Sequence, residues 1–288
     1  MCRFTYYLGD EITVADLVTR PENSLIHQSV HASERPEPLN GDGFGLVWYV
    51  PDDPKPARFR SLTPAWNNAN LAELARVTKS RCIMPHVRAA TSGTYDVSED
   101  NCHPFRCGPF AFMHNGDIPA FSKIRRPLMD GLSDPGFASV RGNTDSEHMF
   151  AIAMEHLRGH ENESSCHLLA EALHATVMRI LELLNEHAAD THAYLNLVLT
   201  DGRNAAACRF SSDENYIDSL YVNQGSRYRC DGDVCYMAEP DDSSRAVLIS
   251  SEPLNQGPRW KEIPRNHVAL VSADLSVSMR ELAACSGD

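Results

Sequence analysis

The second residue of the chain is a cysteine placed directly before a strand-forming segment. Cys2 is followed by Arg3 to Leu8, which is rich in the aromatic and β-branched residues that favour strands. Removal of Met1 would leave Cys2 with a free α-amine, which titrates near pH ~8 and can accept the thiol proton at neutral pH. The sequence therefore predicts a terminal thiol nucleophile that is its own base, against the plainer alternative of an incidental cysteine at a frayed end.

Charge and hydropathy exclude several classes of partner. The formal net charge of the 288 residues is −13, which argues against binding to nucleic acid or to anionic membranes. No apolar run reaches the roughly 20 residues of a membrane span, and the opening segment lacks the layout of a signal peptide. We therefore expect a cytoplasmic protein with no nucleic-acid partner and no membrane partner.

The cysteines indicate a reduced protein without a metal site. Nine is an odd number, and without an export signal free thiols are the simplest interpretation. Four residues separate Cys102 from Cys107 and Cys230 from Cys235, a looser spacing than zinc sites use, and no histidine pair follows either. We predict no metal and no cofactor.

Hydrophobic patterning predicts an α+β fold with antiparallel sheets. Leu195, Leu197 and Leu199 alternate along one strand, and Asp201-Gly202 signals a hairpin turn after it. No repeat or linker forces a domain boundary, and no glycine-rich phosphate loop opens a helix. The expected strands are 3–8, 44–50, 82–87, 110–114, 193–200, 205–210, 219–223, 245–250 and 267–272; the expected helices are 71–77, 146–157 and one carrying the stripe Leu169, Leu173, Val177, Ile180 and Leu184.

Three further segments carry side chains suited to an amino-acid substrate. Arg88 at a strand end can grip a carboxylate with two charge-assisted hydrogen bonds. The Asn115 amide and the Gly116 N–H lie in a tight turn and can form an oxyanion hole. Asp145 at a helix start offers a carboxylate to a cation. Taken singly, these residues could equally be a salt bridge, a bare turn and a helix cap.

Together these segments resemble the glutaminase domain of class II glutamine amidotransferases, which are N-terminal-nucleophile hydrolases. The second half of the chain, with Ser251-Glu252-Pro253-Leu254, resembles the branch that contains the γ-glutamyl amidohydrolases of ergothioneine synthesis and the amidotransferase-like subunit of glutathione degradation. The matching motifs, in the family's order, are Met1-Cys2, Asp42-Gly43-Phe44-Gly45, His86-x-Arg88-Ala-Ala-Thr91, Asn101-x-His103-Pro104, His114-Asn115-Gly116 and Thr144-Asp145-Ser146-Glu147.

The resemblance implies a four-layer αββα sandwich of two antiparallel sheets, formed by residues 2–288 as a single domain. It implies Cys2 as the nucleophile and Asn115 and Gly116 as the oxyanion hole. It further implies that Arg88 holds the α-carboxylate of a γ-glutamyl group, Asp145 holds its α-ammonium, and Thr91 lines the site. The expected substrate is a small γ-glutamyl amide: glutathione, another γ-glutamyl conjugate or glutamine.

Two departures from the family pattern bear on the acceptor. Ala89 and Ser92 stand where many relatives have Trp and His, in the loop that is mobile in synthase-linked members. The glutaminase-like domain uses nearly all 288 residues, so we expect no ammonia-using synthase in this chain and water as the acceptor. Three alternatives remain open: a glutaminase subunit that feeds a separate synthase, a chain paired with a metallopeptidase-like subunit, and a non-catalytic γ-glutamyl sensor.

Overall fold

Two large antiparallel sheets and one separate hairpin make up the β structure. The computed structural model describes residues 2–34, 39–89, 98–160, 162–232, 234–239 and 245–282. Thr91 falls outside these residues, as does Met1. None of the helices within the described ranges is both long and apolar enough to cross a bilayer.

The first sheet has β1 as its central strand, paired with β12 on one side and β4 on the other. Arg3 lies opposite Val87, so Cys2 and Arg88 sit together at one end of this strand pair. The strand order is β13 (Lys261–Glu262), β9 (Tyr221–Gly225), β12 (Ala246–Ser250), β1 (Arg3–Thr13), β4 (Lys79–Val87), β2 (Phe44–Trp48) and β3 (Ala57–Ser61).

The second sheet is built around the predicted hairpin at Asp201-Gly202. Gly202 has a φ of 84°, which favours glycine, and the two strands beside it pair in antiparallel register. The strand order is β15 (Val277–Glu281), β14 (His267–Val271), β8 (Ala205–Ser211), β7 (Tyr194–Thr200), β6 (Phe110–Asp117) and β5 (Phe105–Cys107).

The separate hairpin corrects one expectation about the cysteines. Its strands are β10 (Tyr228–Asp231) and β11 (Val234–Met237), and their register places Cys230 directly opposite Cys235. The structure joins the two sulfurs in a disulfide, so the expected free thiols are not found at this pair. Cys2 and Cys102 are among the cysteines that remain free.

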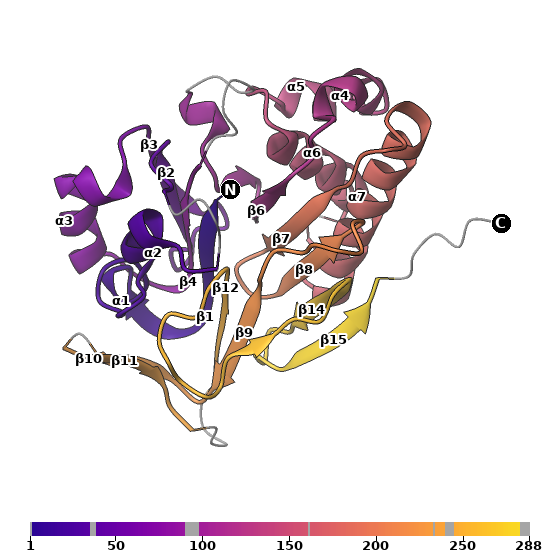
Figure 1. Cartoon of the computed structure of the whole chain (residues 1–288). Coiled ribbons are helices and arrows are strands. Elements are labelled where there is room, and N and C mark those ends of the chain that lie inside the picture. Colours follow the sequence, from indigo (N-terminus) through magenta and orange to yellow (C-terminus); the bar gives the residue numbers. More distant parts are fainter. Residues whose placement is uncertain are drawn as a thin grey trace.

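Helices cover the outer faces of both sheets, as Figure 1 shows. Within the described ranges, three helices pack on the first sheet, and two pack on the second with two more packed against them, which gives the expected order of helix, sheet, sheet and helix. The helices are α1 (Ala15–Val18), α2 (Leu25–His31), α3 (Ala69–Val77), α4 (Phe121–Asp130), α5 (Asp134–Ser139), α6 (Asp145–Leu157) and α7 (Cys166–His187), with 3-10 turns at Ala65–Asn67 and Glu99–Asn101.

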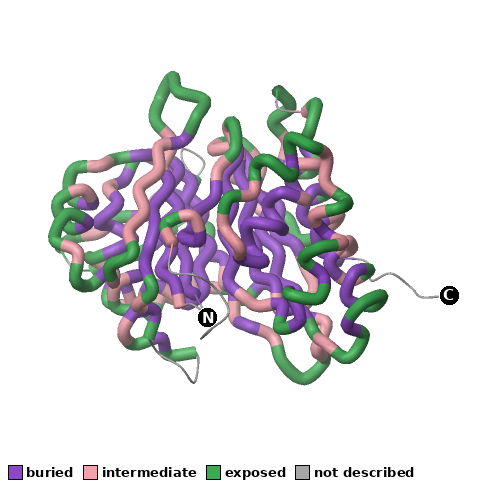
Figure 2. The backbone as a smooth tube through the Cα atoms, turned by 90° about the horizontal axis from the view of Figure 1, so that it is seen from above, coloured by how far each residue is buried: buried purple, intermediate pink, exposed green. Residues whose placement is uncertain are grey.

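Three hydrophobic cores separate the four layers. Alternation along β1 directs Phe4, Tyr6 and Leu8 into the core between the sheets, while Tyr7 faces the core beneath α1 to α3. The second sheet contributes small side chains such as Ala111 and Ala207 to the central core, which leaves room for these rings. Figure 2 shows the buried backbone concentrated in the two sheets and exposed backbone at the periphery.

Patterning predicted the main strands and the long helices, and these are confirmed. The leucines 195, 197 and 199 all face the core beneath α6 and α7, as the alternation indicates. The helices α1, α2, α4 and α5 were not predicted. The helices α1, α2 and α5 are short, with four, seven and six residues, and α4 contains Pro127, which normally interrupts a helix.

A buried ion pair fixes the start of β1. Arg3 Nε donates to Glu252 Oε1 at 2.8 Å, and both side chains are essentially inaccessible to solvent. Arg3 Nη1 also donates to the Cys2 carbonyl at 2.9 Å. Glu252 accepts from the N–H and hydroxyl of Ser33 at 3.0 and 2.7 Å. Burial raises the pKa of Glu252, but these hydrogen bonds and the Arg3 charge outweigh it and hold the pKa below its ordinary value of 4.5.

We predict that Glu252→Ala lowers the free energy of unfolding by about 3–5 kcal/mol at pH 7, because it leaves the buried Arg3 charge without its carboxylate. The matched control is Glu73→Ala, which removes an exposed pair with Arg76 and should change stability by less than ~1 kcal/mol. Urea denaturation measures both changes. Because the folded-state pKa of Glu252 is depressed, its contribution is complete above pH 4.5 and fades as pH falls through the lower folded value. Equal stability of the two variants would contradict this assignment.

Candidate active site

Cys2 directly precedes β1 at one end of the first sheet, where the strands on both sides hold the chain in place. On one side, Phe4 N–H donates to the Ser251 hydroxyl at 3.1 Å and Ser251 N–H donates to the Phe4 carbonyl at 3.0 Å. On the other side, the Cys2 Sγ lies 3.7 Å from the Ala89 carbonyl oxygen. The residue is only 9% exposed. Its thiol is therefore placed by backbone pairing and not by a flexible chain end.

The Asp42-Gly43-Phe44-Gly45 segment fixes the position of Arg88. Asp42 N–H donates to the Arg88 carbonyl at 3.0 Å, and Arg88 N–H donates to the Gly43 carbonyl at 2.9 Å. Gly45 packs against the next site segment, since a Cβ there would lie 1.9 Å from the His103 carbonyl oxygen. This motif thus joins the strand that carries Arg88 to the loop that carries His103.

The Arg88 guanidinium is a buried charge whose two terminal nitrogens have no hydrogen-bond acceptor among the described residues. The side chain is 3% exposed, and within the described ranges neither Nη1 nor Nη2 has a hydrogen-bond acceptor. An unpaired cation in a protein interior costs several kcal/mol. An anionic ligand bound to the guanidinium would compensate this cost.

Asn115 is another buried side chain of the site with unmet hydrogen bonds in the described chain. It lies in β6, is fully buried, and neither its Oδ1 nor its Nδ2 has a partner in the described parts of the chain. Its neighbour Gly116 allows two strands to approach closely, because a Cβ there would lie 1.8 Å from the Tyr194 carbonyl oxygen. The amide of Asn115 is free to donate to a ligand oxygen, as an oxyanion hole requires.

A short network ties β6 to the start of α6. His114 Nδ1 lies 2.8 Å from the Ser146 hydroxyl, and Asp145 Oδ1 accepts from Ser146 N–H at 2.7 Å. Asp145 Oδ2 accepts from Ile118 N–H at 3.2 Å. Thr144 caps the helix by accepting from the N–H of residue 147. Asp145 is thus held at a helix N-terminus, where the helix dipole favours a carboxylate.

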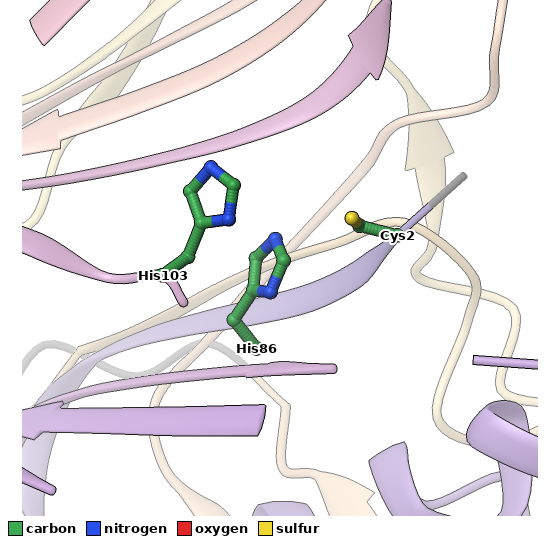
Figure 3. Close-up of side chains that lie close together, drawn as sticks. All are labelled: Cys2, His86 and His103. Carbon is green, nitrogen blue, oxygen red and sulfur yellow. The ribbon is translucent and has the colours of Figure 1, made fainter. Parts of the chain in front are cut away.

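Two stacked histidines lie beside the Cys2 thiol. The ring centroids of His86 and His103 are 4.1 Å apart, and one ring nitrogen of each lies within 4.8 Å of the Cys2 Sγ. Figure 3 shows the sulfur directed toward the rings. Burial lowers the pKa of His86 to about 3 and holds the pKa of His103 well below its usual range. Both imidazoles are neutral and weakly basic near pH 7, so neither is suited to deprotonate the thiol.

These contacts connect the site across the two sheets. His86 lies on β4 opposite Phe4, and its Nε2 is 3.0 Å from the His114 carbonyl on β6. His114 precedes Asn115 and contacts Ser146, which follows Asp145. A continuous series of contacts thus links Cys2 and its strand neighbour Arg88 with Asn115 and Asp145. A cavity of about 1030 Å³ elsewhere is lined by Leu8 and Ser80 and by none of these residues.

Comparison with known proteins agrees with this geometry. A family model described as class II glutamine amidotransferases matches residues 29–284. This chain is a class II glutamine amidotransferase. A Saccharomyces cerevisiae relative, "Probable glutamine amidotransferase DUG3", is 34% identical over 94% of this chain and 82% of its own length. A Mycolicibacterium smegmatis relative, "Gamma-glutamyl-hercynylcysteine sulfoxide hydrolase", is 29% identical over 93% of this chain and 94% of its own.

Solved structures confirm the predicted fold class. A glutamine aminotransferase class-II domain protein from Silicibacter pomeroyi superposes with a TM-score of 0.68 at 24% identity, covering 98% of this chain and all of its own. The glutamine phosphoribosylpyrophosphate amidotransferase of B. subtilis gives a TM-score of 0.60 at 12% identity, over 98% of this chain and 49% of its own. At these identities the likeness shows the fold alone, an αββα sandwich shared with class II amidotransferases.

Sequence reasoning placed the family's motifs but overlooked several contacts. The motifs that contain His86 and His103 indicate no role for either, although two histidines in separate motifs can meet when strands pair. The motifs likewise indicate no role for Ser146 or Glu252. The roles of Cys2, Arg88, Asn115, Gly116 and Asp145 remain predictions, and that of Thr91 lies outside the described residues.

We predict that Gly116→Ala abolishes activity and lowers the melting temperature, because the new Cβ would overlap the Tyr194 carbonyl of the neighbouring strand. The control is Gly108→Ala, which also has a positive φ, of 54°, but has no atom within 4 Å of the added Cβ. This control should cost only about 1 kcal/mol and keep full activity. Thermal unfolding and steady-state kinetics of both variants make the comparison. An active Gly116→Ala enzyme of wild-type stability would contradict the close approach.

Proposed function

We propose that this chain hydrolyses small γ-glutamyl amides through a thioester on Cys2. After removal of Met1, the α-amine accepts the thiol proton and the Cys2 sulfur attacks the γ-carbonyl carbon. The tetrahedral intermediate collapses as the C–N bond breaks, and the leaving amine takes the proton. Water then adds to the γ-glutamyl thioester, the C–S bond breaks, and glutamate leaves with the thiol restored.

The observation that carries this proposal is the buried guanidinium of Arg88, which directly follows the strand beside Cys2 and whose Nη1 and Nη2 have no acceptor among the described residues. The α-carboxylate of a γ-glutamyl group is a planar anion that a guanidinium can bind with two hydrogen bonds. We assign the α-ammonium to Asp145, and Thr91 to the lining of the site. A zwitterionic head group would thus meet one cation and one anion.

Asn115 and Gly116 are proposed to stabilise the oxyanion that forms during attack. The Asn115 side chain is buried and its Nδ2 has no acceptor in the part of the chain that the structure describes, which supports a donor held ready for the substrate. Hydrogen-bond donors positioned before the reaction are most effective where water is excluded, as at this fully buried residue.

The names of the relatives support a γ-glutamyl amide as the substrate and water as the acceptor. One relative is named a glutamine amidotransferase and another a hydrolase of a γ-glutamyl compound. Candidate substrates are glutathione, other γ-glutamyl conjugates and glutamine. The core between the sheets draws on both halves of the sequence, which supports residues 2–288 acting as a single domain.

We further propose that the chain acts in the cytoplasm and works with a partner subunit. Both points rest on the resemblance to glutathione-degrading amidotransferases. Hydrolysis by the purified chain alone would favour water as the acceptor. Activity that appears only with a copurified synthase would favour the ammonia-supplying alternative. Ligand binding without turnover would favour the sensor.

We predict that Arg88→Met lowers kcat/KM for γ-glutamyl amides by about 100-fold, because two hydrogen bonds from a charged group to the α-carboxylate are lost. The variant should be at least as stable as the wild type, since it removes an unpaired buried charge. The control substrate is 4-aminobutanamide, which lacks the α-carboxylate. Both enzymes should hydrolyse it at similar rates. An equal loss on both substrates would refute carboxylate binding by Arg88.

We predict that Asn115→Ala lowers kcat by about 100- to 1000-fold with little change in KM, because the lost donor acts mainly on the transition state. The fold should survive, since the Asn115 side chain makes no hydrogen bond in the described structure. Steady-state kinetics and circular dichroism provide the test. Unchanged kcat in a folded variant would remove Asn115 from the mechanism.

A further inference from the structure

Cys2, His86 and His103 form a cluster of metal-ligating side chains around the proposed nucleophile. One ligand atom from each lies within 4.8 Å of the other two, and all three residues are buried. Within the ranges that the structure describes, no second group of three such residues comes this close. The cluster brings together the starts of β1 and β5 and the end of β4, which are far apart in sequence.

The hydrogen bonding of His86 prepares it as a ligand. Its Nε2 lies 3.0 Å from the His114 carbonyl oxygen, which can only accept, so Nε2 carries the proton and Nδ1 carries the lone pair. That Nδ1 is buried and has no partner in the described residues. A histidine whose second nitrogen donates to a backbone carbonyl is the usual arrangement in metal sites, because it fixes the tautomer and the ring.

His103 has even fewer hydrogen bonds than His86 in the described chain. The residue is 3% exposed, and neither of its ring nitrogens has a hydrogen-bond partner in the described parts of the chain. An unpaired polar group in the interior costs roughly 1–3 kcal/mol. Its stacking against His86 aligns the two rings beside the Cys2 sulfur, as Figure 3 shows. Each ring thus places a nitrogen within 4.8 Å of the Cys2 sulfur and of the other ring's nitrogen.

We propose that these three side chains form a reversible Zn²⁺ site. One thiolate and two imidazoles are ligands that zinc accepts, and ligand atoms around a tetrahedral zinc lie ~3–4 Å apart. The ligand atoms here lie within 4.8 Å of one another, so binding would draw them closer by about 1 Å. The α-amine freed by removal of Met1 supplies the fourth ligand, in a five-membered chelate ring with the thiolate. The S–Zn bond forms as the thiol proton leaves to solvent, and no electron is transferred.

Bound zinc would block the proposed hydrolysis. It occupies the sulfur lone pair that attacks the substrate and the amine lone pair that accepts the proton. This consequence rests on the proposed function, whereas the binding itself rests only on the cluster. Zinc and a γ-glutamyl substrate should therefore compete for the same site.

The test titrates the Met1-processed protein with Zn²⁺ by calorimetry and with Co²⁺ by absorbance, which reports sulfur ligation as a near-ultraviolet charge-transfer band. We expect one ion per chain in the wild type. Cys2→Ser should lose the charge-transfer band, and His103→Gln should weaken binding by on the order of 100-fold. Matched controls are Cys107→Ser and His27→Gln, which alter an exposed thiol and an exposed imidazole and should bind like the wild type. Circular dichroism confirms folding of each variant.

The outcomes separate this site from the proposed function. Stoichiometric binding that depends on Cys2 and His103 supports the site, and reversal of inhibition by a chelator supports its effect on hydrolysis. Binding that is absent, or unchanged in both Cys2→Ser and His103→Gln, overturns the site while leaving the hydrolase intact. Zinc bound at this cluster with full γ-glutamyl hydrolysis supports the site but contradicts Cys2 as the nucleophile.

Discussion

Hydrogen bonding of β1 on both sides is the constraint on which the site depends. A chain end normally frays, but β1 is the central strand of its sheet, and the buried pair of Arg3 and Glu252 fixes its first residues. In the proposed mechanism one residue supplies both the nucleophile and the base. Placing its backbone therefore places both reacting groups at once, and no separate side chain has to be aligned as the base.

The interior around Cys2 holds polar groups that the protein itself does not satisfy. Arg88, Asn115 and His103 are buried with hydrogen-bonding atoms that lack partners in the described chain. Each costs stability in the empty protein, and the tightly packed sheets around them offset that cost. The arrangement is explained if ligands supply the missing partners: a carboxylate for Arg88, a developing oxyanion for Asn115 and a metal ion for His103. The substrate and the metal ion would then compete for the Cys2 thiol.

Much of the fold could be predicted from the sequence, because two-residue alternation and the Asp201-Gly202 turn determine strands locally. The pairing of those strands could not, since register depends on contacts between distant segments. Site residues carried by motifs, such as Asn115 and Asp145, were identifiable from their chemistry. The stacking of His86 on His103 was not, because it arises only when β4 and the start of β5 meet. The disulfide at Cys230 escaped prediction for the same reason, since spacing alone does not show which cysteines face each other across a hairpin.

The central claim is that a processed terminal cysteine forms the covalent intermediate. The most direct measurement is mass spectrometry of the active protein after reaction with a diazo-ketone analogue of glutamine, first intact and then as peptides. The account predicts one adduct per chain, on a peptide that begins at Cys2 and lacks Met1, with activity lost in proportion to labelling. An adduct on another cysteine, or full activity in protein that retains Met1, would contradict it.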